Sequence, residues 1–383
     1  MAEVAFQPWH VTGEVGGGLR LPRRGACSSG IESAPFMGTN TLITASERRN
    51  ADLVVVRDLC TSFPTRNNKG KGAARECRAV NGVSLTIKRA ATLGLVGESG
   101  CGKTTLARSL LRLIQPTSGS VWIDGCDVLS APRGLLRRLR RSMQMVFQDP
   151  LGSLNPRMTA GDIIAEPLDV HRIGTPRERR ERATHLLERV GLHSSQGACF
   201  PHELSGGQRQ RVSIARALAL EPKFVVCDEP VSALDTPLQA HILNLLCTLK
   251  QDLGLTYLFV SHNLRVIERI SDRVAVMYLG KIVETADADE LFARPAHPYT
   301  RALLAAIPGR GIDKARPPRA CRSEPPDPAD PPSGCAFHPR CAYRSDECVR
   351  RAPRLESAPG LSPDHLIACH YVDRVLADEN LAE

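Results

Sequence analysis

A short run near residue 100 combines glycines, a lysine and two threonines at a spacing that suits phosphate binding. The run is Gly97-Glu98-Ser99-Gly100-Cys101-Gly102-Lys103-Thr104-Thr105, which fits the pattern G-x-x-x-x-G-K-[ST]. Glycines allow a tight turn whose backbone N–H groups point at phosphate oxygens, and a following helix start adds unpaired donors. Lys103 can reach the outer phosphates, and Thr104 can offer a hydroxyl to Mg²⁺. The run predicts a nucleotide phosphate site; the alternative is an ordinary glycine-rich turn.

Two adjacent acids follow an apolar run further along the chain. Asp228 and Glu229 come directly after residues 223–227. Burying a carboxylate at the end of a strand costs free energy unless a cation lies close to it. With a phosphate loop upstream, Asp228 is expected to hold Mg²⁺ through water and Glu229 to polarise the attacking water. His262 follows the next apolar run, residues 256–260, which predicts a place near the γ-phosphate, although a lone histidine is more often structural.

A second glycine-bearing helix start lies between these two motifs. It is the run Leu204-Ser205-Gly206-Gly207-Gln208. Ser205 is a good N-cap and the glycines leave backbone N–H groups open, so the run predicts a second anion site or, taken alone, an ordinary cap. Phe63 is placed where its ring can stack on a nucleotide base or can belong to the core.

Alternating strands and helices are expected to position these residues. The phosphate loop lies between an expected strand over 92–96 and an expected helix over 106–113. Residues 151–203 have a mostly helical pattern with breaks at prolines 156, 167 and 201, which predicts an inserted helical subdomain. Further strands are expected at 53–56, 59–63, 79–87, 119–124, 143–147, 223–227, 256–260, 273–278 and 281–284, and further helices at 135–141, 238–254 and 301–307.

Composition divides the chain into three expected regions. Residues 1–50 lack periodicity and are expected to form a disordered tail. Residues 51–285 carry the nucleotide motifs, with the helical subdomain at about 150–210. Residues 286–383 form an extension with a short helix, a proline-rich linker and a group of cysteines.

The cysteines of the extension have a spacing that suggests a metal centre. They are Cys335, Cys341, Cys348 and Cys369. Four thiolates suit a [4Fe–4S] cluster or zinc, and spacings wider than Cys-x-x-Cys favour iron–sulfur. Zinc with His338 or His370 replacing one cysteine is the second interpretation, and free thiols are the third.

The whole chain of 383 residues has a net charge of +9 and 13 cysteines. It shows no apolar run that could span a bilayer and no secretory signal, which predicts a cytoplasmic protein with free or metal-bound thiols. The positive charge is compatible with nucleic acid or an anionic membrane, but the basic residues are spread along the chain, which favours a solvated surface.

Taken together and in this order, the motifs resemble the ATP-binding subunit of an ABC transporter over about residues 52–285. The resemblance implies an α/β, P-loop NTPase fold with a RecA-like core, an antiparallel β subdomain, a helical subdomain and a small cysteine-containing extension. It implies a Walker A loop at 97–104, a base-stacking Phe63, a Q-loop Gln148 near Mg²⁺, a Walker B Asp228, a catalytic Glu229, a D-loop at 232–235 with Asp235, and a switch His262. Ser205, Gly206, Gly207 and Gln208 would contact ATP held by the opposite subunit of a head-to-tail dimer.

The extension narrows the resemblance to the oligopeptide and dipeptide permease ATPases, through His297-Pro298-Tyr299-Thr300-Arg301 and the cysteines. The implied function is ATP hydrolysis that energises peptide uptake, at the cytoplasmic face of the inner membrane. The implied partners are two membrane permeases, a second ATPase and an extracytoplasmic peptide-binding protein, without nucleic acid. The resemblance also implies a [4Fe–4S] cluster in the extension.

Three alternatives remain open. Nickel and glutathione importers share these motifs. A soluble ABC ATPase acting on nucleic acid is disfavoured by the single cassette without a heptad run. A regulatory subunit without hydrolysis is disfavoured by the intact Glu229 and His262.

Overall fold

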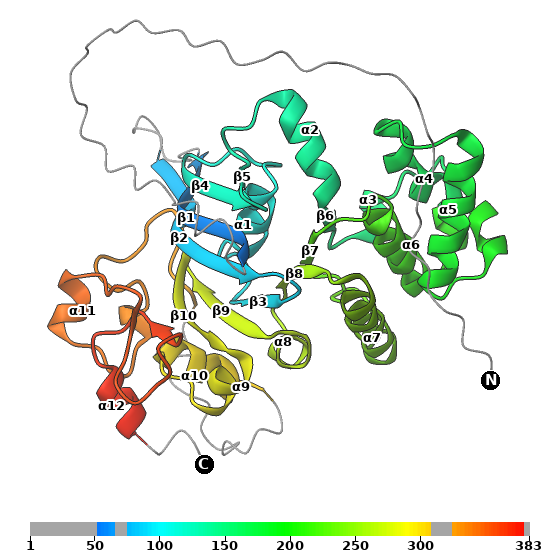
Figure 1. The fold of residues 1–383 in the computed structure, drawn as a ribbon. Coiled ribbons are helices and arrows are strands. Elements are labelled where there is room, and N and C mark those ends of the chain that lie inside the picture. Colours follow the sequence, from blue (N-terminus) through cyan, green and yellow to red (C-terminus); the bar gives the residue numbers. More distant parts are fainter. Residues whose placement is uncertain (1–51, 66–74, 308–323, 379–383) are drawn as a thin grey trace, which may run out of the picture. The chain divides into compact units, whose positions relative to one another are not determined.

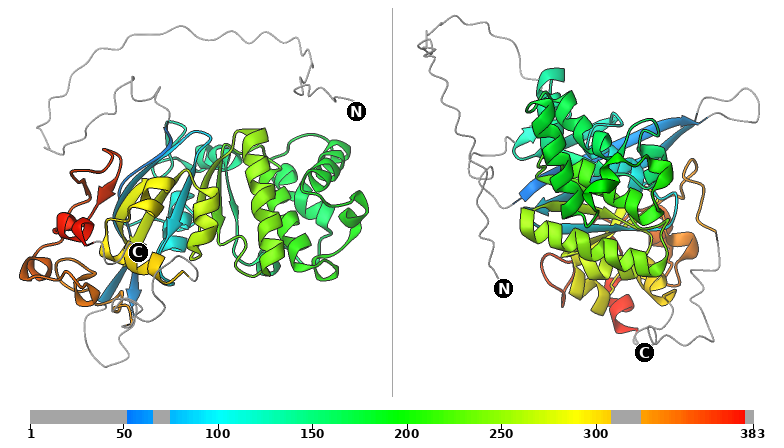
Figure 2. Two further views of the ribbon diagram at one scale, coloured as in Figure 1. Left: turned by 90° about the horizontal axis from the view of Figure 1, so that it is seen from below. Right: turned by 90° about the vertical axis from the view of Figure 1, so that its right-hand side faces the viewer.

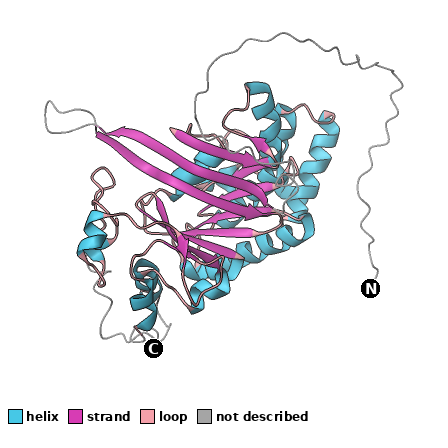
Figure 3. Cartoon of the chain, turned by 60° about the vertical axis from the view of Figure 1, so that its left-hand side comes forward, coloured by secondary structure: helices cyan, strands magenta, loops and turns pink. Residues whose placement is uncertain are grey.

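The computed structural model describes residues 52–65, 75–307 and 324–378, which form two β-sheets with helices packed against them (Figures 1 and 3). The expected tail over residues 1–50 lies outside the described residues. A four-stranded antiparallel sheet has the order β2-β1-β4-β5, and an eight-stranded mixed sheet has the order β11-β12-β10-β9-β3-β8-β7-β6. The predicted α/β fold with an antiparallel β subdomain is confirmed.

The antiparallel sheet contains one strand where the sequence predicted two. Its strands are β1 (Asp52–Thr65), β2 (Arg75–Lys88), β4 (Ser118–Ile123) and β5 (Cys126–Asp127). The two expected strands at 53–56 and 59–63 are joined in β1, which stays paired with β2 across a shift in register near Asp58, where φ is 46°. Such a bulge bends a strand without ending it.

The half of the mixed sheet that ends at β6 consists of parallel strands. They are β3 (Thr92–Val96), β8 (Thr256–Val260), β7 (Phe224–Asp228) and β6 (Met143–Val146), each paired in parallel with the next. β3, β7 and β8 are buried along their whole length, which explains their unbroken apolar runs. The carboxyl ends of parallel strands lie at one edge of the sheet, so the residues that follow these strands are brought together there.

The two faces of the mixed sheet belong to two different hydrophobic cores. In β7, Phe224 and Val226 belong to one core and Val225 and Cys227 to the other, as the alternation of side chains along a strand requires. The first core also contains residues of the antiparallel sheet and of the helices α1 (Lys103–Leu110) and α2 (Arg133–Ser142). The second contains residues of α7 (Thr236–Leu253), α8 (Leu264–Ile270), α9 (Ala288–Ala293) and α10 (Pro298–Ala305).

A group of helices follows β6, as predicted (Figure 2). Its members are α3 (Pro150–Ser153), α4 (Ala160–Val170), α5 (Pro176–Arg189) and α6 (Gly206–Leu218). Thr175 and Glu178 form a reciprocal capping box at the start of α5. Pro167 was expected to break a helix, but it lies inside α4, close enough to its end at Val170 that few backbone hydrogen bonds are affected.

The residues after position 286 continue the core sheet. β10 (Lys281–Asp287) forms the predicted hairpin with β9 (Arg273–Tyr278). On its other side, β10 pairs with the short strand β12 (Leu366–Ile367). β12 in turn pairs with β11 (Glu356–Ser357), next to β10 in Figure 1. Two short helices complete this part, α11 (Asp346–Arg350) and α12 (Val372–Ala377).

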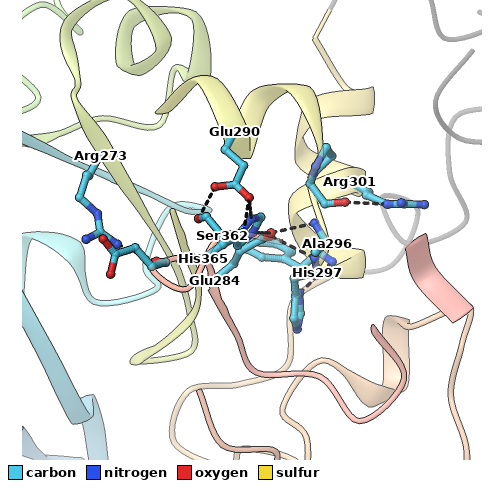
Figure 4. Close-up of polar contacts among 11 residues, drawn as sticks. Arg273, Glu284, Glu290, Ala296, His297, Arg301, Ser362 and His365 are labelled. Carbon is cyan, nitrogen blue, oxygen red and sulfur yellow. Dashed lines mark hydrogen bonds and ion pairs between the residues drawn. The ribbon is translucent and has the colours of Figure 1, made fainter. Parts of the chain in front are cut away.

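A buried ionic cluster attaches the extension to β10 (Figure 4). The fully buried Glu284 accepts hydrogen bonds from the backbone N–H groups of Ala296 at 2.7 Å and His297 at 3.1 Å. The buried His365 places Nε2 2.7 Å from Glu284 Oε1 and Nδ1 3.2 Å from Glu290 Oε1. Burial opposes a charge on His365, but the two carboxylates outweigh burial and raise the pKa of the imidazole. The two carboxylates therefore favour the charged form of His365.

This cluster predicts a dependence of stability on pH. Because the pKa of His365 is raised by folding, its contribution is fully present below the unfolded value of about 6.5 and is lost as the pH rises through the raised value. We expect His365→Gln to lower the melting temperature of the full chain more at about pH 6 than at about pH 9. The exposed His241 on α7 provides the control His241→Gln, for which we expect little change in melting temperature. A pH-independent loss in His365→Gln would contradict the ionic interpretation.

Candidate active site

The glycine-rich run forms a loop between β3 and α1, as predicted. Gly102 is the N-cap of α1 with φ 107°, and a Cβ there would lie 2.0 Å from the carbonyl oxygen of Ala79. A Cβ at Gly97 would lie 2.2 Å from the carbonyl oxygen of Met277. Only glycine fits at these two positions, because the loop packs directly against the backbone of β2 and β9.

The lysine of the loop lies within the curve of the loop. Lys103 is 5% exposed, and its Nζ donates to the carbonyl oxygens of Gly97 and Glu98, each at 2.9 Å. Cys101 is buried beside it, and burial raises the pKa of this thiol above its ordinary value. The ammonium is thus held beside the N-terminus of α1, where a phosphate anion would bind.

Asp228 meets the first helical turn after the loop. The Thr104 hydroxyl donates to Asp228 Oδ1 at 3.0 Å, and the carboxylate is fully buried at the end of β7. Its Oδ2 is buried without a hydrogen-bond partner among the described residues. Burial raises the pKa of Asp228, against the opposing effect of Thr104 and nearby cations. An unpaired buried carboxylate oxygen next to a threonine hydroxyl fits the predicted Mg²⁺ site.

Three further predicted residues meet at the same edge of the sheet. Gln148 follows β6, Glu229 follows β7 and His262 follows β8. Gln148 Nε2 donates to Glu229 Oε2 at 3.0 Å, and His262 Nδ1 lies 3.2 Å from Glu229 Oε1. The Glu229 backbone has φ 46°, an unusual value for a residue other than glycine and one that often marks functional positions. The Glu229 carboxylate is therefore held between Gln148 and His262.

The second helix start forms α6 but does not join this site. Ser205 and Gln208 form a reciprocal capping box, with Gln208 N–H donating to Ser205 Oγ at 3.3 Å. Ser205 and Gly206 are exposed, and a Cβ on Gly206 would meet Leu234 of the predicted D-loop at 3.6 Å. Within the described ranges, no hydrogen bond or ion pair joins residues 205–208 to residues 97–105. One chain therefore presents this helix start, together with the exposed Asp235, to the outside.

The structure also shows the surroundings of the predicted Phe63 and two contacts of the phosphate loop that were not predicted. Phe63 lies near the end of β1 with 39% of its surface exposed, so its ring is accessible for stacking. Sequence reasoning missed Tyr299 and Arg340, which both contact Glu98 of the phosphate loop. Arg340 is separated from Glu98 by 242 positions, so no spacing pattern could have indicated the contact.

The four cysteines of the extension lie near one another. Burial, together with the negative charge of neighbouring cysteines, raises the pKa of Cys341 to about 12 and that of Cys369 to about 11. Cys335 N–H donates to the carbonyl oxygen of Cys348 at 2.7 Å. However, in the described part of the chain no group of three or more His, Cys, Asp or Glu side chains is arranged to hold a metal ion. The predicted iron–sulfur cluster therefore stays a prediction.

An open groove of about 730 Å³ lies between the sheet edge at β6 and the helical group. Its walls combine apolar side chains with arginines, and it reaches Gln148 of the site. Its lining includes Arg108, Leu113, Arg140, Met145, Phe147, Gln148, Val170 and Arg216.

Among the described residues, no helix is both long and apolar enough to cross a membrane.

Comparisons with known proteins agree with the geometry. A family model described as ABC transporter matches residues 80–232, and one described as oligopeptide/dipeptide transporter, C-terminal region, matches residues 283–348. The oligopeptide transport ATP-binding protein AppF of Bacillus subtilis is 47% identical over 322 residues, which cover 83% of this chain and 97% of AppF. The di/tripeptide transport ATP-binding protein DppF of Pseudomonas aeruginosa is 45% identical, over 85% of this chain and 99% of DppF.

A solved structure is similar over the nucleotide-binding part. The ATP-binding cassette MJ0796, in a dimeric post-hydrolysis state bound to ADP and Pi, is 30% identical with a TM-score of 0.55. The similarity covers 61% of this chain and 98% of that cassette.

Proposed function

Because this chain belongs to the family of ABC transporter ATP-binding proteins and carries the C-terminal region of the oligopeptide and dipeptide transporters, we propose that it energises peptide import. The chain is an ABC-type ATPase. The names of relatives such as AppF and DppF support a di- or oligopeptide cargo. One structural observation carries the proposal of hydrolysis, namely the Glu229 carboxylate oriented by Gln148 and His262 at the sheet edge next to the phosphate loop.

In the proposed reaction, the N–H groups of residues 97–105 and the Lys103 ammonium bind the phosphates of ATP. Thr104 and Asp228, with Gln148 nearby, are the residues that would hold Mg²⁺, which when bound neutralises phosphate charge. Glu229 polarises the water that attacks the γ-phosphate. His262 holds the carboxylate in this orientation and senses the γ-phosphate.

We further propose a head-to-tail dimer in which Ser205, Gly206, Gly207 and Gln208 bind the ATP of the opposite subunit. Two observations support this arrangement: Ser205 and Gly206 are exposed, and among the described residues no hydrogen bond joins residues 205–208 to the phosphate loop of the same chain. Closure of the dimer would complete both sites, and hydrolysis would reopen them. Phe63 stacks on the adenine base and Asp235 contributes from the D-loop in this proposal.

The groove beside Gln148 is the proposed docking site for a membrane permease. It lies next to a residue that contacts Glu229, so a partner in the groove can influence the active site. We therefore propose that the chain is a peripheral protein at the cytoplasmic face of the inner membrane. We propose that the chain has three regions, a tail at 1–50, a nucleotide-binding part at 51–285 and an extension at 286–383.

The groove predicts a variant that separates docking from nucleotide binding. Val170 lines the groove with 53% of its surface exposed, and Val170→Glu places a charge there. We expect the variant to lose copurification with the permeases while its affinity for ATP stays within about twofold of the unmodified chain, because a single surface charge acts locally. Leu253→Glu, at a 39% exposed residue on α7, is the control and should copurify normally. Equal loss in both variants would contradict docking in the groove.

The function itself is tested by affinity purification of the full chain from detergent-solubilised membranes. We expect two permeases and a second ATPase, whose reconstituted complex hydrolyses ATP faster when a peptide-loaded binding protein is added. Stimulation by nickel or glutathione in place of peptide would reassign the cargo. Recovery of RNA or DNA without permeases would contradict the transport function.

We propose that Cys335, Cys341, Cys348 and Cys369 hold a [4Fe–4S] cluster. The donor set supports this, because four free cysteines occur in one segment, where the Cys335 N–H donates to the carbonyl oxygen of Cys348. Anaerobic purification with iron, sulfide and zinc analysis is the test. About four irons per chain, lost when the four cysteines are replaced by serine, would support the cluster. Zinc alone would indicate a structural zinc site. If the protein contains neither iron nor zinc, both the cluster and the zinc site are contradicted.

A further inference from the structure

An arginine of the extension, Arg340, contacts the phosphate loop. Arg340 ends the 3₁₀ turn His338–Arg340, and its side chain is 4% exposed. Its two terminal nitrogens donate to the two carboxylate oxygens of Glu98, each at 2.8 Å. This two-pronged geometry is the strongest and most directional form of an arginine–carboxylate pair. A residue of the cysteine segment is therefore bound to a residue of the phosphate loop.

Aromatic side chains hold the arginine in place. The guanidinium lies 5.8 Å from the ring centres of both Tyr278 and Phe337. Phe337 is 1% exposed and packs edge-on against Tyr278 at 5.3 Å and tilted against Tyr299 at 5.4 Å. Since these rings come from β9, from α10 and from the segment that carries the four cysteines, the position of the guanidinium depends on packing among all three.

Every polar group of Glu98 is engaged. Its backbone N–H donates to the Tyr299 hydroxyl at 2.8 Å, and its side chain is held by Arg340. Its carbonyl oxygen accepts from Lys103 Nζ at 2.9 Å and from the N–H of Cys101 at 3.3 Å. Tyr299 and Arg340, both from the extension, thus determine where Glu98 lies. Glu98 in turn contacts Lys103, the lysine proposed to bind the phosphates.

We propose that Arg340 is a positioning residue of the ATP site, which holds the Glu98 carboxylate away from the bound phosphates and keeps the phosphate loop in its binding conformation. The inference rests on the proposed role of residues 97–105 in ATP binding. Without Arg340, the loop would carry an unpaired negative charge close to a highly charged anion. The extension would then be part of the nucleotide site and not only an attachment to the core.

The proposal is tested by the affinity of the full chain for AMP-PNP, a non-hydrolysed ATP analogue. Arg340→Met removes the cation and keeps an apolar chain of similar length among the rings. We expect affinity to fall about tenfold in this variant, because the freed carboxylate repels the phosphates. Glu98→Gln combined with Arg340→Met should bring affinity back to within about threefold of the unmodified chain, since the double variant has no free charge in the loop.

Arg344→Met is the matched control, because Arg344 is an exposed arginine of the same segment. Its affinity should be unchanged. Unchanged affinity in Arg340→Met would overturn the proposal, and so would a loss that Glu98→Gln does not rescue, because that loss would come from general destabilisation. Lys103→Met tests whether residues 97–105 are the ATP site at all. If this variant binds AMP-PNP as tightly as the unmodified chain, residues 97–105 are not the ATP site.

A second measurement applies where Arg340→Met does not fold. Arg340→Lys keeps the charge but cannot donate in the two-pronged geometry. Hydrogen exchange of the backbone amides of residues 97–104 should be faster in this variant than in Arg344→Met. Equal exchange in the two variants would overturn the proposal.

Discussion

Glu229→Gln is expected to lower the rate of ATP hydrolysis by about 100-fold to 1,000-fold, because an amide cannot polarise the attacking water as a carboxylate does. ATP binding should persist, since the phosphates are held by the loop and by Lys103. The shape of the site is also retained, because a glutamine oxygen can still accept from Gln148, which lies 3.0 Å from the present carboxylate. Steady-state hydrolysis by the assembled transporter and nucleotide binding by the full chain are the two measurements.

The matched control for this variant is Glu268→Gln. Glu268 is an exposed glutamate on α8, the helix that follows His262, so the same chemical change is made outside the strand edge. Hydrolysis should be unaffected there. A normal rate in Glu229→Gln would remove this residue from the mechanism, and equal losses in the two variants would point to misfolding.

Lys103→Met is expected to weaken ATP binding by about 100-fold, which corresponds to the loss of charge-assisted contacts to the outer phosphates. The ammonium donates to two carbonyl oxygens of its own loop at 2.9 Å, so it lies where the phosphates are proposed to bind. Methionine keeps much of the buried side-chain volume and removes only the charge and the donors. Calorimetric titration of the full chain with ATP measures the effect.

Lys88→Met is the control, since Lys88 is an exposed lysine at the end of β2. Its affinity for ATP should match that of the unmodified chain. Retained affinity in Lys103→Met would mean that nucleotide binding does not depend on this loop.

The local parts of the active site could be predicted because they are defined by short spacings along the chain. The order of strand, glycine-rich turn and helix indicates a phosphate loop, and in the structure Lys103 and Thr104 lie at the start of α1, directly after this turn. The capping box at Ser205 is equally local. Steric demands such as the 2.0 Å approach at Gly102 explain why glycine is required there.

The meeting of Gln148, Glu229 and His262 was predictable to a lesser degree. Each follows an apolar strand, and parallel strands end at the same edge, so a shared location was expected. The sheet order β8-β7-β6 then decided that Glu229 lies between the other two. Sequence patterns do not contain this order, because strand pairing depends on how the helices pack against the sheet.

The sequence by itself determined the phosphate loop, the acids at the end of β7, the helical group and the family. Only the tertiary structure decided how the extension joins the core, through β12 beside β10, the buried Glu284–His365 pair and the contact of Arg340 with Glu98. These contacts join residues 81 and 242 positions apart. Such pairs leave no periodicity or spacing in the sequence, because they form only when separate elements pack and bury their charges together.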